Sequence, residues 1–359
     1  MKVRVIIDNG FEALEAELAR HNRVFAVMDS RVASECAASH ELAELFGRRG
    51  VPGMLIEASE QTKTMDTVMD VCSWLLEQGA DRDALVLAIG GGVTSDIVGF
   101  AAAIYKRGVR SAYIPTTFLA QVDAAIGGKT GVNFNNYKNI LGVIRQPEFT
   151  YLCPQVLESL PRRDFLSGAA ELLKTFIIED GGYFDRAVQW LRGYALTQTS
   201  EEAVEYMRAG MDELSALVKA AADVKIAVVS RDQFEKGERR KLNLGHTFAH
   251  AIETLAQRKG YDITHGEAVS MGILMAAELA DAYEMRNPED GLARRLDEAF
   301  LSCGLPIGCP FRVSAMAEVM RKDKKASAGL VHFVLPFEVG DVRVVDFSVE
   351  DVVRLLSVK

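Results

Sequence analysis

Two histidines in the stretch LNLGHTFAHAIE have a spacing that suits metal binding. The stretch runs from Leu242 to Glu253 and places His246 and His250 four residues apart. Residues at this spacing lie on one face of a helix. Because imidazole nitrogens are frequent zinc ligands, this face can hold a metal ion, work as a catalytic pair, or simply pack against its neighbours. The spacing favours a metal site and leaves the other two interpretations open.

A catalytic zinc ion needs a third protein ligand, and two further side chains in the sequence offer one. His265 stands at the head of a predicted helix in THGEAV, and Glu171 lies on an earlier predicted helix in FLSGAAELLKTFII. Any three of the four side chains can complete a site with one position open for a substrate. Spacing alone does not select the three ligands.

Basic residues lie in the same segments as these candidate ligands. They are Lys174 in AELLK, Lys225 in ADVKIAVVS, Arg239 in KGERRKLN and Lys324 in RKDKK. The chain as a whole has a formal net charge of -9. Cations gathered near a metal site in an acidic protein indicate an acidic small-molecule substrate, whereas isolated ones would be ordinary solvated charges.

A glycine run follows the apolar stretch ALVLAI and precedes a helical pattern, over residues 84–105. Glycines let a ligand approach the backbone closely, and the first turn of a helix offers N–H groups to an anion such as a pyrophosphate. The run is not the G-x-G-x-x-G pattern of dinucleotide-binding folds. A ligand site and a tight strand-to-helix turn are equally consistent with it.

A second glycine-rich stretch, IPTTFLAQVDAAIGGKTGVNFNNYKN, covers residues 114–139 and is more informative. It contains Asp123, Lys129, Lys138 and Asn139, and a lysine serves well as a point charge for a phosphate group. We predict a long ligand-binding loop here, in preference to a loop of solvated lysines.

The elements that must position these residues fall into two groups. Up to about residue 150, short apolar runs alternate with helical patterns, which predicts a parallel sheet with helices on both faces. The predicted strands are 3–7, 24–28, 53–57, 84–89 and 111–114, and the helices include 31–46 and 64–78. Beyond residue 154 the predicted elements are helices 163–178, 200–218 and 265–284, a hairpin of 330–335 with 342–346, and a last helix 349–358. We therefore predict an α/β domain over residues 1–153 and a mainly α-helical domain over 154–359, with a ligand cleft between them.

Composition excludes several classes of protein. Hydrophobic residues make up 49% and charged residues 25% of the 359 residues, which is the globular range. The negative net charge argues against a nucleic-acid partner, and no apolar run reaches the roughly 18 residues of a membrane span. The N-terminal MKVRVIIDNG reads as a strand and not as a signal peptide. Five cysteines without a C-x-x-C motif predict a reducing cytoplasm.

Together these motifs resemble those of the 3-dehydroquinate synthase family, which belongs to the sugar phosphate cyclases. The matching stretches lie in the family's order between residues 60 and 325: GGGVTSDIVGFAAAIYKRG, IPTTFLAQVDAAIGGKTGVN, KNILGVIRQP, SGAAELLKTFII, LNLGHTFAHAIE, HGEAVSMG and RKDKK. The resemblance implies an NAD-binding α/β domain, a mainly helical domain, NAD+ as a catalytic cofactor, and a divalent metal, zinc or cobalt. It implies a cytoplasmic homodimer that converts 3-deoxy-D-arabino-heptulosonate 7-phosphate to 3-dehydroquinate and phosphate.

The resemblance also implies individual roles. The metal ligands would be Glu171, His246 and His265, so that His250 would face the substrate instead. The substrate positions would be Arg107, Asp123, Lys129, Asn139, Lys174, Lys225, Arg239, Asn243, His250 and Lys324. The NAD+ positions would be Asp29, Glu60, Lys63, Gly92, Val93, Thr94, Ser95, Asp96, Thr116, Thr117, Lys129 and Lys138.

These positions can divide the substrate between them. Lys129, Asn139 and Lys324 would hold the phosphate, while Lys225 and Arg239 would hold the carboxylate. Three alternatives remain open: another sugar phosphate cyclase, a metal-dependent NAD alcohol dehydrogenase, and a non-catalytic NAD-binding regulator. The substrates of the sibling cyclases lack a carboxylate, so the Lys225 and Arg239 pair favours the heptulosonate.

Overall fold

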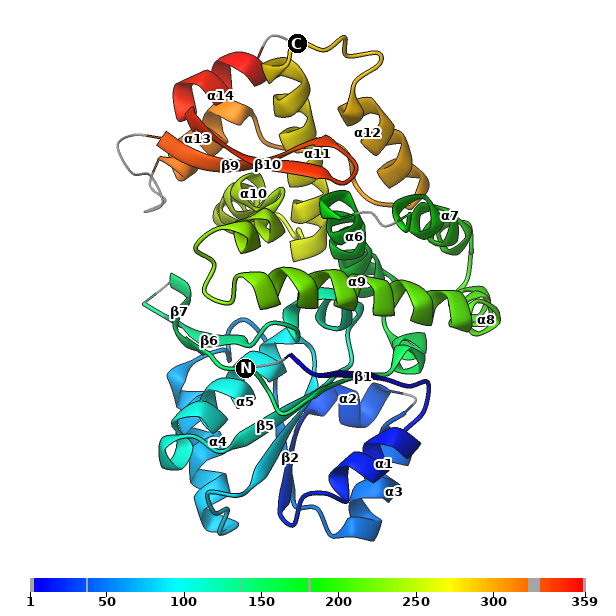
Figure 1. Cartoon of the computed structure of the whole chain (residues 1–359), viewed down its shortest axis with the longest axis vertical. Helices are drawn as coiled ribbons and strands as arrows, with labels where there is room; N and C mark the ends of the chain where they lie inside the picture. Colours follow the sequence, from blue (N-terminus) through cyan, green and yellow to red (C-terminus); the bar gives the residue numbers. More distant parts are fainter. Residues whose placement is uncertain (1–2, 37, 136, 180–181, 322–329, 358–359) are drawn as a thin grey trace. The chain divides into compact units, whose positions relative to one another are not determined.

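The computed structural model describes residues 3–36, 38–135, 137–179, 182–321 and 330–357. These form two compact units (Figure 1). The first consists of Met1–Phe165 with Met207–Ser230, and the second of Leu166–Tyr206 with Arg231–Lys359. The long helix α9 (Met211–Arg231) thus belongs almost wholly to the first unit. The domain division at residue 154 stays a prediction.

A six-stranded parallel sheet forms the centre of the first unit, as predicted. Its order is β1-β8-β5-β4-β2-β3, with bounds β1 Val5–Ile7, β2 Val24–Asp29, β3 Gly53–Ile56, β4 Leu85–Gly90, β5 Arg110–Pro115 and β8 Thr150–Leu152. Every residue of β4 is buried, because both faces of a parallel sheet are covered by its crossover helices. The short strand β8 was not predicted.

Helices cover the two faces of this sheet. The helices are α1 Glu12–Leu18, α2 Ser30–Glu35, α3 Ser39–Arg49, α4 Met65–Glu77 and α5 Gly92–Ile104. Figure 1 shows α1–α3 and α4–α5 on opposite sides, which follows from right-handed crossovers when the strand order changes direction. The single helix predicted over 31–46 is two helices, because the backbone at Cys36 is extended.

The stretch predicted as a long loop contains an antiparallel hairpin instead. A π-helical turn, Ala120–Ala124, leads to β6 Lys129–Phe134 and β7 Tyr137–Ile144. Gly131 and Gly142 face one another in this hairpin, and a side-chain carbon on Gly142 would lie 2.3 Å from the carbonyl oxygen of Thr130. The glycines therefore serve close backbone approach and not a flexible loop.

The second unit is mainly helical, as predicted. Its elements are α6 Arg162–Ile178, α7 Phe184–Ala195, α8 Ser200–Ala209, η4 Glu238–Asn243, α10 His246–Lys259, α11 His265–Tyr283, α12 Leu292–Ser302, α13 Val313–Met320, β9 Leu330–Glu338, β10 Asp341–Ser348 and α14 Val349–Leu356. Helix α11 is buried along most of its length and packs against α10, α12, α14 and β9. The helix predicted over 200–218 is divided at Gly210 into α8 and α9.

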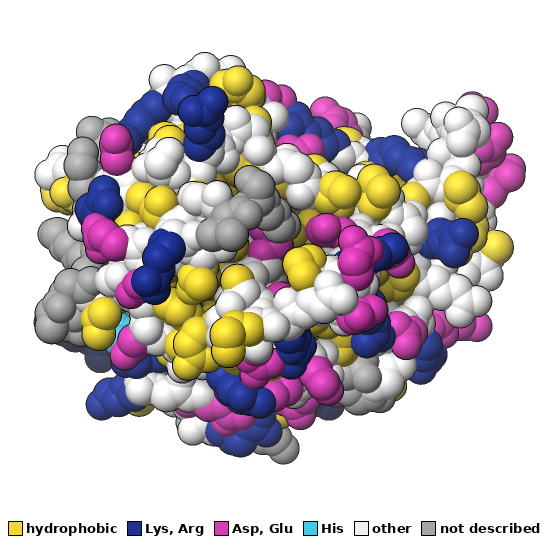
Figure 2. Space-filling view, turned by 90° about the horizontal axis from the view of Figure 1, so that it is seen from above, with side chains coloured by type: hydrophobic (Ala, Val, Ile, Leu, Met, Phe, Trp, Pro, Cys, Tyr) yellow, Lys and Arg dark blue, Asp and Glu magenta, His cyan; other side chains and the backbone are white. Residues whose placement is uncertain are grey.

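Charges of both signs are mixed on the face of the molecule that Figure 2 displays. Figure 2 shows Lys and Arg side chains interspersed with Asp and Glu side chains over the face that it displays. Among the described residues, no helix combines the length and apolarity that crossing a bilayer requires.

The burial of the sheet gives a prediction for stability. Leu87→Ala in β4 should lower the free energy of unfolding by about 2–5 kcal/mol, because it leaves a cavity at a fully buried position. Leu55→Ala in β3 is the matched control, since that side chain is 61% exposed. This substitution should change the free energy of unfolding by no more than about 0.5 kcal/mol. The free energy of unfolding of both variants is measured by urea unfolding, followed by the fluorescence of Trp74. The ring of Trp74 packs on Phe25 in this unit, and the second tryptophan is removed by Trp190→Phe. Equal losses in the two variants would contradict the assignment.

Candidate active site

Three potential metal ligands converge in the second unit. Glu171 on α6, His246 at the start of α10 and His265 at the start of α11 each place one ligand atom within 4.8 Å of the others. Glu171 Oε1 lies 3.6 Å from His246 Nε2 and 3.1 Å from His265 Nε2. Ligands about 2.0–2.1 Å from a tetrahedral zinc ion lie about 3.3 Å apart, so the donor set and its spacing fit such an ion.

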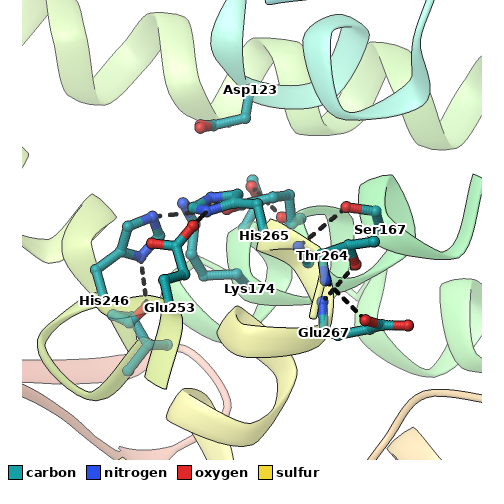
Figure 3. Close-up of polar contacts among 12 residues, drawn as sticks. Asp123, Ser167, Lys174, His246, Glu253, Thr264, His265 and Glu267 are labelled. Carbon is teal, nitrogen blue, oxygen red and sulfur yellow. Dashed lines mark hydrogen bonds and ion pairs between the residues drawn. The ribbon is translucent and has the colours of Figure 1, made fainter. Parts of the chain in front are cut away.

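The outer nitrogen of each histidine is already bonded. His246 Nδ1 lies 3.1 Å from the carbonyl oxygen of Leu244, and His265 Nδ1 lies 3.4 Å from Glu253 Oε1 (Figure 3). A carbonyl oxygen can only accept, so the His246 Nδ1–H donates and its Nε2 keeps a lone pair. The Glu253 carboxylate favours the same tautomer in His265. Such outer partners orient a metal-binding histidine and raise its basicity.

Local structure explains why α11 begins at His265. Thr264 and Glu267 form a reciprocal capping box that starts α11 at His265. The next residue, Gly266, donates its N–H to Ser167 Oγ at 3.0 Å, and a side-chain carbon there would lie 2.2 Å from the carbonyl oxygen of Ser167. Helices α6 and α11 can therefore approach closely only with glycine at position 266.

His246 owes its place to a second close approach. Gly245 precedes it with φ +77°, a conformation that favours glycine, and a side-chain carbon there would lie 2.7 Å from the backbone nitrogen of Ile273 in α11. The start of α10 is thereby set against α11, which carries the other histidine.

The electrostatics of this cluster depend on a buried ion pair. Lys174 Nζ lies 2.5 Å from Glu171 Oε2, and both side chains are almost completely buried. Burial raises the pKa of Glu171, but the charge of Lys174 and the hydrogen bond from His265 outweigh it and hold that pKa well below its usual value. Burial, helped by Lys174, lowers the pKa of His246 to about 3. Burial alone would lower the pKa of His265, whereas the hydrogen bonds to Glu171 and Glu253 raise it to about 10. A bound cation would displace the His265 proton.

The second predicted histidine of the α10 face is not part of this cluster. His250 is exposed, and its ring centroid lies 5.7 Å from that of His246 in an edge-to-face arrangement. It therefore lies beside the ring of His246 and is exposed to solvent.

Arg239 and Asn243 lie on one short helical segment, η4, before α10. Asp232 accepts hydrogen bonds from the backbone N–H groups of residues 236, 237 and 239, which fixes this segment and lowers the pKa of Asp232. Arg239 is buried and donates to the carbonyl oxygen of Gln233 at 2.7 Å. Asn243 Nδ2 donates to Glu235 Oε1 at 2.6 Å.

In the first unit, two predicted substrate residues form an ion pair. Lys225 on α9 donates at 2.5 Å to both the carbonyl oxygen and Oδ1 of Asp123. Lys225 is buried, and Asp123 belongs to the π-helical turn before the β6–β7 hairpin. The long helix and the turn are thus tied together by a single ammonium group.

A second ion pair joins the predicted NAD+ residues. The buried Lys63 lies 2.5 Å from Asp96 Oδ2 in the second turn of α5, and it also donates to Asn139 Oδ1 at 2.6 Å. Burial raises the pKa of Asp96 to about 6, against the opposing effect of Lys63.

A cavity of the first unit lies at the carboxyl ends of β2, β4 and β5, where open α/β sheets bind ligands. Half of the predicted NAD+ positions line it: Asp29, Gly92, Val93, Thr94, Thr116 and Thr117. The other lining residues were not predicted and include Arg31, Glu35, Cys36, Val156, Ser159 and Asp164. No motif indicated the 156–164 wall, because it becomes a neighbour of the glycine turn only through the fold.

The remaining predicted residues are dispersed. Lys129 and Lys138 are exposed on β6 and β7, and Ser95 is buried in α5. Arg107 is exposed beyond the end of α5 and just before β5. It therefore lies at the amino ends of the strands, whereas the glycine turn lies at their carboxyl ends. Lys324 lies outside the described residues.

Two family models match successive parts of the chain. The model of the 3-dehydroquinate synthase N-terminal domain matches residues 53–167, and that of the C-terminal domain matches residues 168–326. A 3-dehydroquinate synthase of Pyrococcus abyssi is 39% identical over 88% of both chains. A 3-dehydroquinate synthase of Xanthomonas oryzae pv. oryzae is 37% identical over 98% of this chain and 95% of its own.

Solved structures also resemble the chain over nearly its whole length. The 2-epi-5-epi-valiolone synthase ValA of Streptomyces hygroscopicus, solved with NAD+ and Zn2+ bound, superposes with a TM-score of 0.85 at 29% identity. The similarity covers 99% of this chain and 96% of that one.

The outer partner of His265 gives a testable prediction. Glu253→Gln should lower the affinity for Zn2+ by about 10- to 100-fold, because an amide orients the imidazole less strongly than a carboxylate does. Competition with a chelating dye measures this without any turnover. Glu267→Gln, which changes a neighbouring carboxylate in the capping box, is the matched control and should keep the affinity nearer to the original. Unchanged zinc affinity in Glu253→Gln would show that Glu253 does not support His265 as a metal ligand.

Proposed function

The chain belongs to the 3-dehydroquinate synthase family, and from this we propose that it converts 3-deoxy-D-arabino-heptulosonate 7-phosphate to 3-dehydroquinate and phosphate. The observation that carries the proposal is the convergence of Glu171, His246 and His265, beside the buried Lys174, in a chain that matches both family domains. We propose that the first unit binds NAD+ and that these three side chains bind a divalent metal, zinc or cobalt.

The two cofactors divide the chemistry. When bound, NAD+ supplies reversible hydride transfer and the metal supplies Lewis acidity toward the substrate's hydroxyl oxygens. The protein's part is to hold the groups that these reactions need. Glu171 keeps Oε1 toward the two histidines because Lys174 occupies Oε2. His250, exposed next to His246, can take or return a proton of a ring hydroxyl.

Two cations support the choice of an acidic substrate. Lys225 and Arg239 are both buried, and each is held by protein oxygens in the present structure. A guanidinium can bind a carboxylate with two parallel hydrogen bonds, and an ammonium adds a point charge. We therefore assign the substrate carboxylate to these two residues and its phosphate to Lys129, Asn139 and Lys324. The substrates of the sibling cyclases lack a carboxylate, so this assignment favours the heptulosonate.

We further propose that the protein acts as a homodimer in the cytoplasm. The five cysteines, Cys36, Cys72, Cys153, Cys303 and Cys309, are all free, which supports a reducing compartment. The homodimer rests on the family resemblance.

The direct test is release of phosphate from 3-deoxy-D-arabino-heptulosonate 7-phosphate by the zinc-loaded protein, with NAD+ well below the substrate concentration. We expect many phosphates per NAD+ and no accumulation of NADH absorbance, because the hydride is returned in each cycle. NADH formed in proportion to product would indicate an alcohol dehydrogenase. Absence of phosphate release, with release from a carboxylate-free sugar phosphate, would indicate a sibling cyclase.

The carboxylate assignment gives a separate prediction. Arg239→Lys should raise KM for the heptulosonate about 10-fold or more, because one fork-shaped charged contact is lost. The exposed neighbour Arg240→Lys is the matched control and should leave KM near the original value. Bound zinc, measured by elemental analysis, should be unchanged in both variants. Equal KM values for Arg239→Lys and the original protein would contradict the assignment of Arg239 to the substrate carboxylate.

A further inference from the structure

The side chain of Asn133 joins two predicted binding segments of the first unit. Asn133 lies near the end of β6, and its Nδ2 donates to the carbonyl oxygen of Glu60 at 3.2 Å and to Glu60 Oε2 at 3.0 Å. Its Oδ1 accepts the backbone N–H of Asn139 at 2.9 Å. One amide group therefore uses its donors on the 59–63 loop and its acceptor on β7.

The backbone at Asn139 explains why a side chain is needed there. The ladder between β6 and β7 pairs Val132 with Leu141 and Phe134 with Tyr137, so its register is interrupted between these pairs. Asn139 lies in this interruption with φ +53°, a conformation that few residues other than glycine and asparagine adopt readily. The oxygen of Asn133 replaces the bond that a regular ladder would supply to this N–H group.

The 59–63 loop is otherwise well fixed, so the link has a firm base. The Thr62 hydroxyl donates to the carbonyl oxygen of Glu57 at 2.6 Å, and the Ser59 N–H donates to the Thr62 hydroxyl oxygen at 2.9 Å. Lys63 accepts the N–H of Asn133 with its carbonyl oxygen at 2.9 Å, while its ammonium group binds Asp96 and Asn139.

We propose that Asn133 is a positioning residue that aligns Glu60 of the NAD+ site with Asn139 of the substrate phosphate site. The proposal rests on the proposed function, which assigns Glu60 and Lys63 to NAD+ and Asn139 to the substrate. Asn133 acts through its two neighbours and needs no contact with either ligand. Because the Lys63 bonds to Asp96 and Asn139 remain when the Asn133 side chain is changed, variants at 133 keep a second connection between loop and hairpin.

The chemistry of the amide predicts different results for two substitutions at position 133. Asn133→Asp keeps an oxygen for the Asn139 N–H, but it loses both donors and places a carboxylate beside that of Glu60. Asn133→Ala removes the donors and the acceptor together. The loss of a single hydrogen bond typically changes an equilibrium by about 3- to 10-fold.

The experiment compares both variants with the original protein and with Asn135→Asp, which adds the same charge at an exposed position of the same hairpin. The dissociation constant of NAD+ is measured by titration without substrate, and KM for the heptulosonate by phosphate release. Hydrogen exchange of peptides covering residues 137–144 is followed in the absence of ligands. Circular dichroism confirms that each variant is folded.

We expect NAD+ to bind about 3- to 10-fold more weakly in Asn133→Ala and at least as weakly in Asn133→Asp. The substrate KM and the exchange at residue 139 should rise in Asn133→Ala, while Asn133→Asp keeps slow exchange and a KM close to that of Asn135→Asp. NAD+ affinity equal to the original in both variants would overturn the link to Glu60. Slow exchange in Asn133→Ala would overturn the link to Asn139.

Failure of the proposed function gives a different pattern. If the original protein releases no phosphate from the heptulosonate or binds no NAD+, the assigned ligands are wrong. The exchange of residues 137–144 still decides whether Asn133 holds Asn139, because it is measured on the protein alone.

Discussion

The buried ion pair between Lys174 and Glu171 is the interaction on which the second unit depends. A carboxylate without exposure to water is strongly destabilising unless charges and hydrogen bonds compensate it. Glu171 obtains this compensation from Lys174 on its own helix, three residues along, and from His265 on another helix, whose Nε2 lies 3.1 Å from Oε1. Helices α6 and α11 must therefore meet at this point, and the capping box of α11 together with Gly266 allows them to do so. Gly245 sets the start of α10, with His246, against α11.

The same arrangement recurs in the first unit. Lys63 and Lys225 are both buried, and each lies 2.5 Å from a carboxylate oxygen, as Lys174 does. In each case an acidic residue of the protein holds a cation in place in a chain of net charge -9. An anionic ligand that approaches such a lysine meets a charge that is already oriented, so less side-chain entropy is lost on binding. Under the proposed function, Lys225 would meet the substrate carboxylate in this way, as a charge that Asp123 already orients.

The sequence predicted the sheet better than the site. Apolar runs such as 84–89 identify a strand that is buried on both faces, because burial itself selects those residues. The β6–β7 hairpin was not predicted. Its two strands approach each other closely at glycines, and a flexible loop would contain the same residues. Glu253 lies in the quoted histidine stretch, yet its role depends on a histidine twelve residues later in another helix. No motif indicated Asn133, since the role proposed for it depends on an interruption in strand pairing.

The pair of histidines four residues apart shows where spacing stops being informative. A shared helix face brings the rings of His246 and His250 near each other, but it does not decide which of them faces Glu171. That choice is made by the start of α10, where Gly245 and the carbonyl oxygen of Leu244 orient the first ring toward a carboxylate 75 residues earlier in the chain. The second ring, one turn further along, remains exposed. A local pattern can therefore nominate candidate ligands, whereas the long-range packing of three helices selects among them.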